Sequence, residues 1–206
     1  MLVVPTLTRH DLLEGMLASV DYPIKHLVVI DNSGRGIAEP SGPWDRLTVL
    51  RMPVNFGVAA SWNLAIKMAH KEPYVLIGSD DVTFAPGSLA SWADVSSEDD
   101  IVLTGTWPNW CAFSIGARVV HRVGLFDEGY FPAYYEDNDY ARRLARSEIV
   151  SLEGPPVGHA NSSTLNTPDA GFANANHFSF VRNRELFEQD RHHGFDPYRW
   201  RSQTWT

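Results

Sequence analysis

Short apolar segments alternate with segments of helical periodicity through the first half of the chain, and this alternation limits the possible folds more than any other feature. The runs HLVVID at 26–31 and YVLIG at 74–78 are continuous and apolar, as is typical of strands covered on both faces. Residues 9–20 and 57–70 carry apolar side chains at helical spacing. Further strands are expected at 2–5, 47–52 and 101–105. This pattern predicts an α/β fold with a mostly parallel central sheet and helices on both faces.

The second half of the chain has a different character. Residues 106–115 are rich in aromatic side chains and are expected to form a loop, and a short helix is expected over 117–126. An aromatic turn and an acidic helix start follow within 127–146. Beyond about residue 154, Gly, Pro, Asn, Ser and His dominate, and the tail over 190–206 is expected to be irregular. The chain of 206 residues is expected to form one domain.

The composition excludes several classes of protein. The formal net charge is −8, which argues against binding to a nucleic-acid backbone because that binding depends on Lys and Arg. A single cysteine, Cys111, excludes an internal disulfide framework and a Cys-based zinc site. No apolar stretch approaches the roughly 20 residues that span a bilayer, and the start of the chain lacks a basic leader. We expect a cytoplasmic protein without a transmembrane segment.

Two adjacent aspartates, Asp80 and Asp81, follow the predicted strand at 74–78, and Asp31 ends another predicted strand. Ligands of open α/β sheets bind beyond the carboxyl ends of the strands. Adjacent carboxylates repel one another, and hard divalent cations such as Mg²⁺ or Mn²⁺ prefer carboxylate oxygens. The aspartate pair therefore suggests a cation site. The alternative is a solvated turn in which Asp81 caps a neighbouring segment.

A second acidic group lies in YYEDNDYARRL, residues 134–144. The buried stripe of the predicted helix is expected to comprise Tyr140, Ala141 and Leu144. Asp137 points toward that stripe, whereas Asp139 is expected to pair with Arg143 on an exposed face. Glu136, Asp137 and Asp139 also suit the positive N-terminus of a helix without any function. The preceding aromatic run, YFPAYY, favours a site, because aromatic walls can shift the pKa of a carboxyl group.

His159 lies in a loop rich in Gly, Ser and Asn. Such a histidine is either a surface residue or a metal ligand, and the local sequence leaves both possibilities open. The chain has no complete dinucleotide-binding fingerprint, no GxxxxGK phosphate loop and no GxSxG elbow.

Six segments occur in an order that resembles the successive motifs of family 2 glycosyltransferases with the GT-A fold. The segments are VVPTLTR, VVIDNSG, NFGVAASWNLAI, YVLIGSDDVTFAPGSL, GLFDEGYFPAYYEDNDYARRL and VGHANSST. The resemblance covers about residues 2–165 and is closest to the rhamnosyltransferase-like branch. Ser79 departs from the family's strict DxD motif by replacing its first acid, which predicts modest metal affinity.

The resemblance implies a reaction and its partners. The family implies transfer of a sugar, with inversion, from a UDP-, GDP- or dTDP-linked donor to an acceptor hydroxyl, with Mn²⁺ or Mg²⁺ as the divalent cation. The acceptor is a glycan, a lipid-linked saccharide or a protein. In one GT-A domain over 1–206, residues 1–105 would bind the nucleotide sugar, residues 106–165 would hold the acceptor and catalytic groups, and residues 166–206 would form a C-terminal extension.

The same resemblance assigns roles to individual residues. The expected nucleotide-sugar site comprises Pro5, Thr6, Arg9, Asp31, Asn55, Gly57, Asn63 and Asp80. The expected metal ligands are Asp81 and His159, and the expected general base is Asp137 with Glu136 beside it. The aromatic side chains of Trp107, Trp110, Tyr134 and Tyr135 are expected to hold the acceptor, although Trp107 and Trp110 are equally suited to packing under a loop.

Two other classes compete with this hypothesis. A nucleotidyltransferase that makes nucleotide sugars shares the α/β layout and the cation, but it usually has a glycine-rich basic loop that PTLTRHDLLEG does not match. A non-catalytic sugar-binding module on the same fold is compatible with Ser79 and with the compact C-terminal region.

Overall fold

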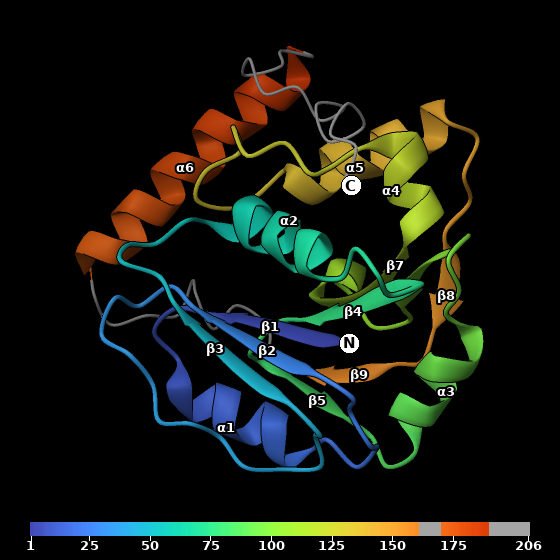
Figure 1. Ribbon diagram of the computed structural model, residues 1–206. Helices are drawn as coiled ribbons and strands as arrows, with labels where there is room; N and C mark the ends of the chain where they lie inside the picture. Colours follow the sequence, from blue (N-terminus) through green and yellow to red (C-terminus); the bar gives the residue numbers. More distant parts are fainter. Residues whose placement is uncertain (161–169, 190–206) are drawn as a thin grey trace.

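The computed structural model describes residues 1–160 and 170–189 of the chain. Their main element is one central sheet of seven strands (Figure 1). The strand order is β3-β2-β1-β4-β7-β6-β8. Its strands are β1 (Leu2–Thr6), β2 (Leu27–Asp31), β3 (Leu47–Arg51), β4 (Tyr74–Gly78), β6 (Ile101–Thr104), β7 (Ala112–Gly116) and β8 (Leu152–Gly154). Only β7 runs antiparallel to its neighbours, so the predicted mostly parallel α/β sheet is confirmed.

Helices cover both faces of this sheet, each over its own apolar core. The helices α2 (Val58–Met68), α4 (Ala117–Val123) and α5 (Glu136–Arg146) contribute buried side chains to one core. The helices α1 (His10–Ala18) and α3 (Ser88–Val95) contribute to the other. Every residue of β2 is buried, as its continuous apolar run predicts. In Figure 1, α1 lies on the opposite side of the sheet from α2 and α5.

A small second sheet joins two segments that are distant in the sequence. The strand β5 (Val82–Phe84) pairs antiparallel with β9 (Val157–His159), with Val82 opposite His159. This pairing brings the chain just after β4 next to the chain just after β8. It is the contact that places Asp81 and His159 together.

The prediction of a loop over 106–115 is wrong in its second half. A short 3-10 helix, η1 (Asn109–Cys111), leads into β7, which lies in the middle of the sheet and pairs with both β4 and β6. The polar residue Ser114 interrupts the apolar pattern of β7, but its hydroxyl is paired with the Ser96 hydroxyl at 2.7 Å between oxygens. Burial of a paired hydroxyl is inexpensive, so the strand tolerates it.

The described part of the C-terminal region contains a helix that the sequence pattern did not predict. Residues Ala170–Glu188 form α6, the longest helix of the described chain, which lies near α2 and α5 in Figure 1. Its composition gives a weak amphipathic pattern, and tertiary contacts with the segment before α5 stabilise it. The tail at 190–206 lies outside the described residues. Within the described residues, no helix is both long and apolar enough to span a membrane.

Candidate active site

The carboxyl ends of the parallel strands form one edge of the sheet, and several of the predicted site residues lie there. Thr6 ends β1 and pairs in register with Asp31, which ends β2. Asp80 and Asp81 follow β4, the other neighbour of β1. Pro5 precedes Thr6 in β1, opposite Ile30. The fold therefore brings together, at the edge where α/β sheets bind their ligands, residues that were predicted to bind the nucleotide-sugar donor and its cation; we call them the donor-side residues.

Asp80 is held at this edge by a short hydrogen bond. The Thr6 hydroxyl donates to Asp80 Oδ2 at 2.6 Å. Burial raises the pKa of the Asp80 carboxyl to about 6; the Thr6 hydrogen bond lowers this pKa in part, and the charge of Asp81 raises it again. A negative charge in this position is poorly compensated by the protein's own groups, and a bound cation would compensate it.

Asp81 and His159 form a second polar contact at this edge of the sheet. His159 Nε2 lies 3.2 Å from Asp81 Oδ1, and the Ala160 amide donates to the Asp81 carbonyl at 3.0 Å. His159 Nδ1 is buried without a hydrogen-bond partner in the described part of the chain. A carboxylate is a preferred ligand of Mn²⁺ and Mg²⁺, and an imidazole is a common metal ligand in proteins, so the two residue types fit a divalent cation.

The protein supplies only part of such a coordination sphere. Among residues 1–160 and 170–189, no group of three His, Cys, Asp or Glu side chains has the arrangement of a metal site. Mg²⁺ and Mn²⁺ are commonly held by one or two protein side chains with water and substrate phosphates. Asp81 and His159 therefore fit a cation whose coordination sphere would be completed by a diphosphate.

Arg9 lies on the exposed rim of this edge, just before α1. Its guanidinium makes a two-point ion pair with Asp11, with Nε 2.9 Å from Oδ1 and an outer nitrogen 2.6 Å from Oδ2. Both side chains are largely solvent-exposed, so this pair adds little to stability.

Asp31 presents a buried acceptor at the end of β2. Its Oδ1 accepts a hydrogen bond from the Ser33 amide at 2.9 Å, whereas its Oδ2 is buried with no partner among the described residues. A surface hollow of about 540 Å³ lies beyond the ends of β2 and β3. It is lined by Gly34, Arg35, Gly36, Ile37, Arg51, Met52 and Pro53. This lining includes neither Asp81 nor Asp137.

The loop before α2 is shaped by two asparagines. Asn55 Oδ1 accepts from the Gly57 amide at 2.8 Å, and Asn32 Oδ1 accepts from the Phe56 amide at 3.2 Å. Asn32 also donates to the Ser61 hydroxyl at 3.0 Å. Sequence reasoning did not single out Asn32, although its place directly after Asp31 at a strand end was a usable signal. These contacts fix the backbone around Asn55 and Gly57 next to Asp31.

Gly57 links this loop to the segment before α5. Its φ of +84° lies in the region that favours glycine, and a Cβ there would lie 2.8 Å from the Pro132 carbonyl oxygen. The Val58 amide donates to the same carbonyl at 2.8 Å. The start of α2, which follows the carboxyl end of β3, is thus in contact with the segment that leads to Glu136 and Asp137.

The expectation that Asn63 faces the nucleotide needs correction. Asn63 is fully buried in α2, its Nδ2 donates to the Phe126 carbonyl and to Glu128, each at 2.9 Å, and its Oδ1 accepts from the Phe126 amide. Both ends of its amide are used in fixing the 126–128 segment. Asn63 therefore supports the site from below and does not line it.

Asp137 and Glu136 begin α5 directly after two tyrosines in the left-handed region, Tyr134 at φ 76° and Tyr135 at φ 72°. Asp137 is half-buried, and its Oδ1 accepts from the Asn138 amide at 2.8 Å. Burial raises the pKa of Asp137 above its ordinary value. Glu136 is buried, and this burial, with the nearby charge of Asp137, raises the pKa of Glu136 well above its ordinary value.

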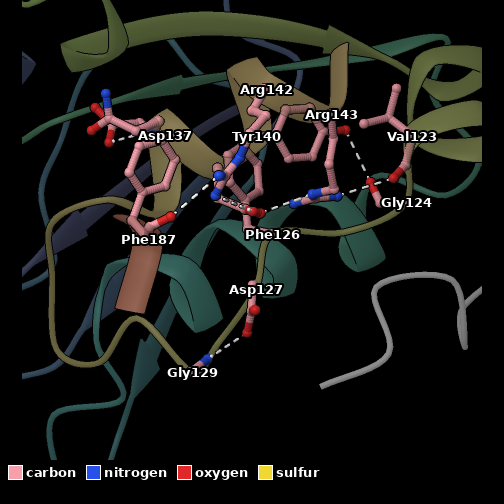
Figure 2. A network of polar contacts seen from close by, with 12 residues as sticks. Val123, Gly124, Phe126, Asp127, Gly129, Asp137, Tyr140, Arg142, Arg143 and Phe187 are labelled. Carbon is pink, nitrogen blue, oxygen red and sulfur yellow. Dashed lines mark hydrogen bonds and ion pairs between the residues drawn. The ribbon is translucent and has the colours of Figure 1, made fainter. Parts of the chain in front are cut away.

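Two expectations for α5 are wrong. Ala141 is exposed, and Arg143 takes its place in the buried stripe with Tyr140 and Leu144. The pair of Asp139 with Arg143 is buried, at 2.8 Å between Nε and Oδ2, and Arg143 also donates to the Val123 carbonyl at 3.0 Å. Figure 2 shows Arg143 between Tyr140 and Val123. Opposite charges can be buried when they are paired, so the sequence periodicity of apolar residues does not reveal the burial of this pair.

The four aromatic side chains expected to hold the acceptor have different positions. Trp110 is buried and packs in the core against Trp62, with ring centroids 6.4 Å apart, so its assignment to the acceptor is corrected to a packing role. Trp107 is 82% exposed beside the same edge of the sheet. Tyr134 and Tyr135 contact α6 through the Phe180 ring, at centroid distances of 5.4 and 5.5 Å.

A chain of contacts links the segment before Asp137 to the carboxyl edge of the sheet. Asp81 follows β4, and the segment before Asp137 contacts the start of α2 beyond β3. The Tyr140 ring of α5 lies 6.0 Å from Trp110, which follows the carboxyl end of β6. These contacts are compatible with one site that includes the end of β4 and the start of α5.

Comparison with protein families identifies the chain. The model of glycosyl transferase family 2 matches residues 1–142, so the chain belongs to this family and is a glycosyltransferase. The match extends from β1 into α5 and includes both groups of acids. No curated protein sequence gives a significant match.

Solved structures show the GT-A fold of the chain. S. aureus TarS 1-349 has a TM-score of 0.58 and 15% identity, over 92% of this chain and 72% of that one. The catalytic domain of Drosophila beta1,4galactosyltransferase 7, solved with xylobiose, has a TM-score of 0.57 and 12% identity, over 78% and 69%. A mutant of the Drosophila enzyme with manganese, UDP-Gal and xylobiose has a TM-score of 0.58 and 12% identity, over 86% and 77%.

The burial of Glu136 gives a prediction about stability. The unfolded chain releases this proton near its ordinary pKa of 4.5, whereas the folded protein keeps it to higher pH. The folded protein therefore loses stability as pH rises from 4.5 to the raised pKa, by about 1.4 kcal/mol per pH unit. Glu136→Gln removes this loss, so we expect the Tm difference between variant and wild type to become more positive from pH 4.5 to pH 8. Glu14→Gln on the exposed face of α1 is the control, and equal pH dependence in both variants contradicts the prediction.

Proposed function

We propose that the protein is a cation-dependent, inverting glycosyltransferase that moves a sugar from a nucleoside-diphosphate donor to an acceptor hydroxyl. The observation that supports this proposal is the contact of Asp81 with His159 beside the buried Asp80, at the carboxyl edge of the sheet. Membership of glycosyl transferase family 2 supplies the class of reaction. The motif resemblance to the rhamnosyltransferase-like branch is part of the proposal.

The donor half would use the ends of β1 and β2. The free buried oxygen of Asp31 suits an N–H or O–H group of the base or ribose, because a buried acceptor without a partner is unfavourable until it is paired. Thr6 and Asp80 would border the diphosphate, with Pro5, Asn55 and Gly57 shaping the nucleotide pocket. Arg9 would exchange Asp11 for a phosphate oxygen, which suits a guanidinium fork. Asp81 and His159 would hold Mn²⁺ or Mg²⁺, which supplies positive charge to the leaving diphosphate.

The acceptor half would use the start of α5. The acceptor oxygen forms a bond to the anomeric carbon while the bond from that carbon to the diphosphate breaks, and the attack from the opposite side inverts the centre. Asp137 takes the proton of the attacking hydroxyl, and its raised pKa makes it a stronger base than an exposed aspartate. Glu136 beside it stays protonated to higher pH, which limits the negative charge at this position.

The acceptor itself is proposed from the surroundings of Asp137. The exposed ring of Trp107 and the rings of Tyr134 and Tyr135 suit the C–H faces of a sugar, and we propose a glycan acceptor. The Drosophila enzyme that shares the fold was solved with xylobiose, which is in keeping with this proposal. Lipid-linked saccharides and proteins are the other acceptor classes to be screened.

A ligand screen tests the proposed function. Thermal stability is measured with nucleoside diphosphates, nucleoside triphosphates and UDP-, GDP- and dTDP-sugars, each with and without Mn²⁺. We expect one diphosphate and its sugar to raise Tm only with the cation, because a ligand that binds the folded state stabilises it. A preference for a triphosphate would support a nucleotidyltransferase. A response to sugars but to no nucleotide would support a sugar-binding module.

A further inference from the structure

The helix α6 packs on the segment that leads into Asp137. The Asn176 amide donates to the Tyr134 hydroxyl at 2.7 Å, and the Phe180 ring contacts both Tyr134 and Tyr135. Farther along α6, the Arg142 guanidinium of α5 lies 3.9 Å from the centre of the Phe187 ring and donates to the Phe187 carbonyl at 3.2 Å. Figure 2 shows Phe187 and Arg142 side by side near Asp137. α6 is thus attached both to α5 and to the turn before it.

This turn has an unfavourable backbone conformation. Tyr134 and Tyr135 are consecutive residues with positive φ, and neither is a glycine. Such residues cost free energy and persist only where their surroundings fix them. The first residue of α5 follows directly, and Asp137 is the second. The position of Asp137 therefore depends on whatever holds the two tyrosines.

One side chain of α6 contacts the backbone of this turn directly. Asn183 is fully buried, and its Nδ2 donates to the Ala133 carbonyl at 2.8 Å and to the Tyr134 carbonyl at 3.3 Å. The side-chain amide supplies two hydrogens in one plane, which matches two successive carbonyls. Among the described residues, Asn183 makes the hydrogen bonds that join α6 to the Ala133 and Tyr134 carbonyls. Loss of its amide would remove both bonds.

We infer that Asn183 is a positioning residue of the active site, which fixes the left-handed Tyr134–Tyr135 turn and so the start of α5 where Asp137 lies. The inference rests on the proposed function only in giving Asp137 the role of the base. It assigns α6, in a region outside the match to the family model, a part in catalysis. The contact with Asn183 is to backbone carbonyls, so it does not depend on which acceptor binds.

Asn183→Ala tests this inference with two readouts. The first is the titration of Asp137, followed by ¹³C NMR of aspartate-labelled protein and assigned with Asp137→Asn. A loosened turn lets water reach the carboxyl group, so its midpoint should fall toward the ordinary value. The second is kinetics with the donor that wild type uses best, where we expect kcat to fall about 10- to 100-fold with the donor KM unchanged.

Ser179→Ala is the matched control, because Ser179 is also buried in α6 but bonds only to the Asn176 carbonyl within the helix. Ser179→Ala should leave both readouts at the wild-type values. If Asn183→Ala does not fold, Asn183→Ser is used instead. Its hydroxyl keeps one donor but is too short to bond both carbonyls, so we expect smaller changes of the Asp137 midpoint and of kcat in the same directions. An unchanged Asp137 midpoint with unchanged kcat in a folded variant overturns the inference. If the Asp137 midpoint shifts in Asn183→Ala but the wild-type protein has no transferase activity, the positioning role of Asn183 is supported and the proposed function is contradicted. Failure of the inference and failure of the proposed function are therefore distinguishable.

Discussion

Asp137→Asn is expected to reduce glycosyl transfer by about 10²- to 10⁴-fold, the usual contribution of a general base. The amide keeps the size of the side chain and the hydrogen bond from the Asn138 amide, but it cannot accept the proton of the attacking hydroxyl. Binding of the nucleoside diphosphate should be unchanged, because Asp81, Asp80 and Asp31 lie on other elements. Release of the nucleoside diphosphate in the presence of acceptor measures the effect.

Asn138→Ala is the control for this prediction, since Asn138 is the exposed neighbour of Asp137 and its backbone amide is retained. In wild type, turnover should decline as pH falls through the raised pKa of Asp137, because only the deprotonated carboxylate accepts a proton. Near wild-type turnover in a folded Asp137→Asn protein would remove Asp137 from the mechanism.

Asp81→Asn is expected to abolish the stabilisation by nucleoside diphosphate that depends on Mn²⁺. In the proposed site the charge of Asp81 would hold the cation together with His159, and the amide of Asp81→Asn retains the shape of the side chain without that charge. Turnover should fall on the order of 10²- to 10³-fold, as when a group that stabilises the developing charge is removed. A chelator should have the same effect on wild type. Calorimetric titration of Mn²⁺ with the diphosphate measures the binding.

His159→Ala should reduce the affinity for the cation less than Asp81→Asn does, since an imidazole that binds a metal ion contributes no net charge. Asp45→Asn, at an exposed position beyond these contacts, is the control. Full activity after chelation would show that the donor site works without a cation and that Asp81 has another role. Loss of activity in Asp45→Asn as large as in Asp81→Asn would indicate a general effect of charge.

The strands and the donor-side acids could be predicted from sequence because their signals are local. The strands β2 and β4 come from continuous apolar runs; Asp31 ends the first, and Asp80 and Asp81 follow the second after Ser79. The position of each acid at a strand end needs no knowledge of distant residues. The order of the six motifs then indicates the family, which the match over residues 1–142 confirms.

The features that sequence reasoning missed depend on partners far along the chain. Trp110 is in the core because Trp62 and Tyr140 come from other helices to pack on it. The pair of Asp139 and Arg143 is buried where Arg143 also donates to the Val123 carbonyl, 20 residues earlier in the chain. The helix α6 is stabilised through Asn183 and its neighbours against a turn about fifty residues earlier. Local periodicity carries no record of such contacts.

The most direct test of the shared site uses the magnetic effect of Mn²⁺ on nearby nuclei. The protein is loaded with Mn²⁺ and the nucleoside diphosphate found in the screen, and NMR line broadening is compared with a Mg²⁺ sample. We predict strong broadening of the Asp137 carboxyl signal and weak broadening at the Tyr74 amide, at the opposite end of β4 from Asp81. A sharp Asp137 signal with bound Mn²⁺, or broadening at Tyr74 as strong as at Asp137, would contradict one site built from the two groups of acids.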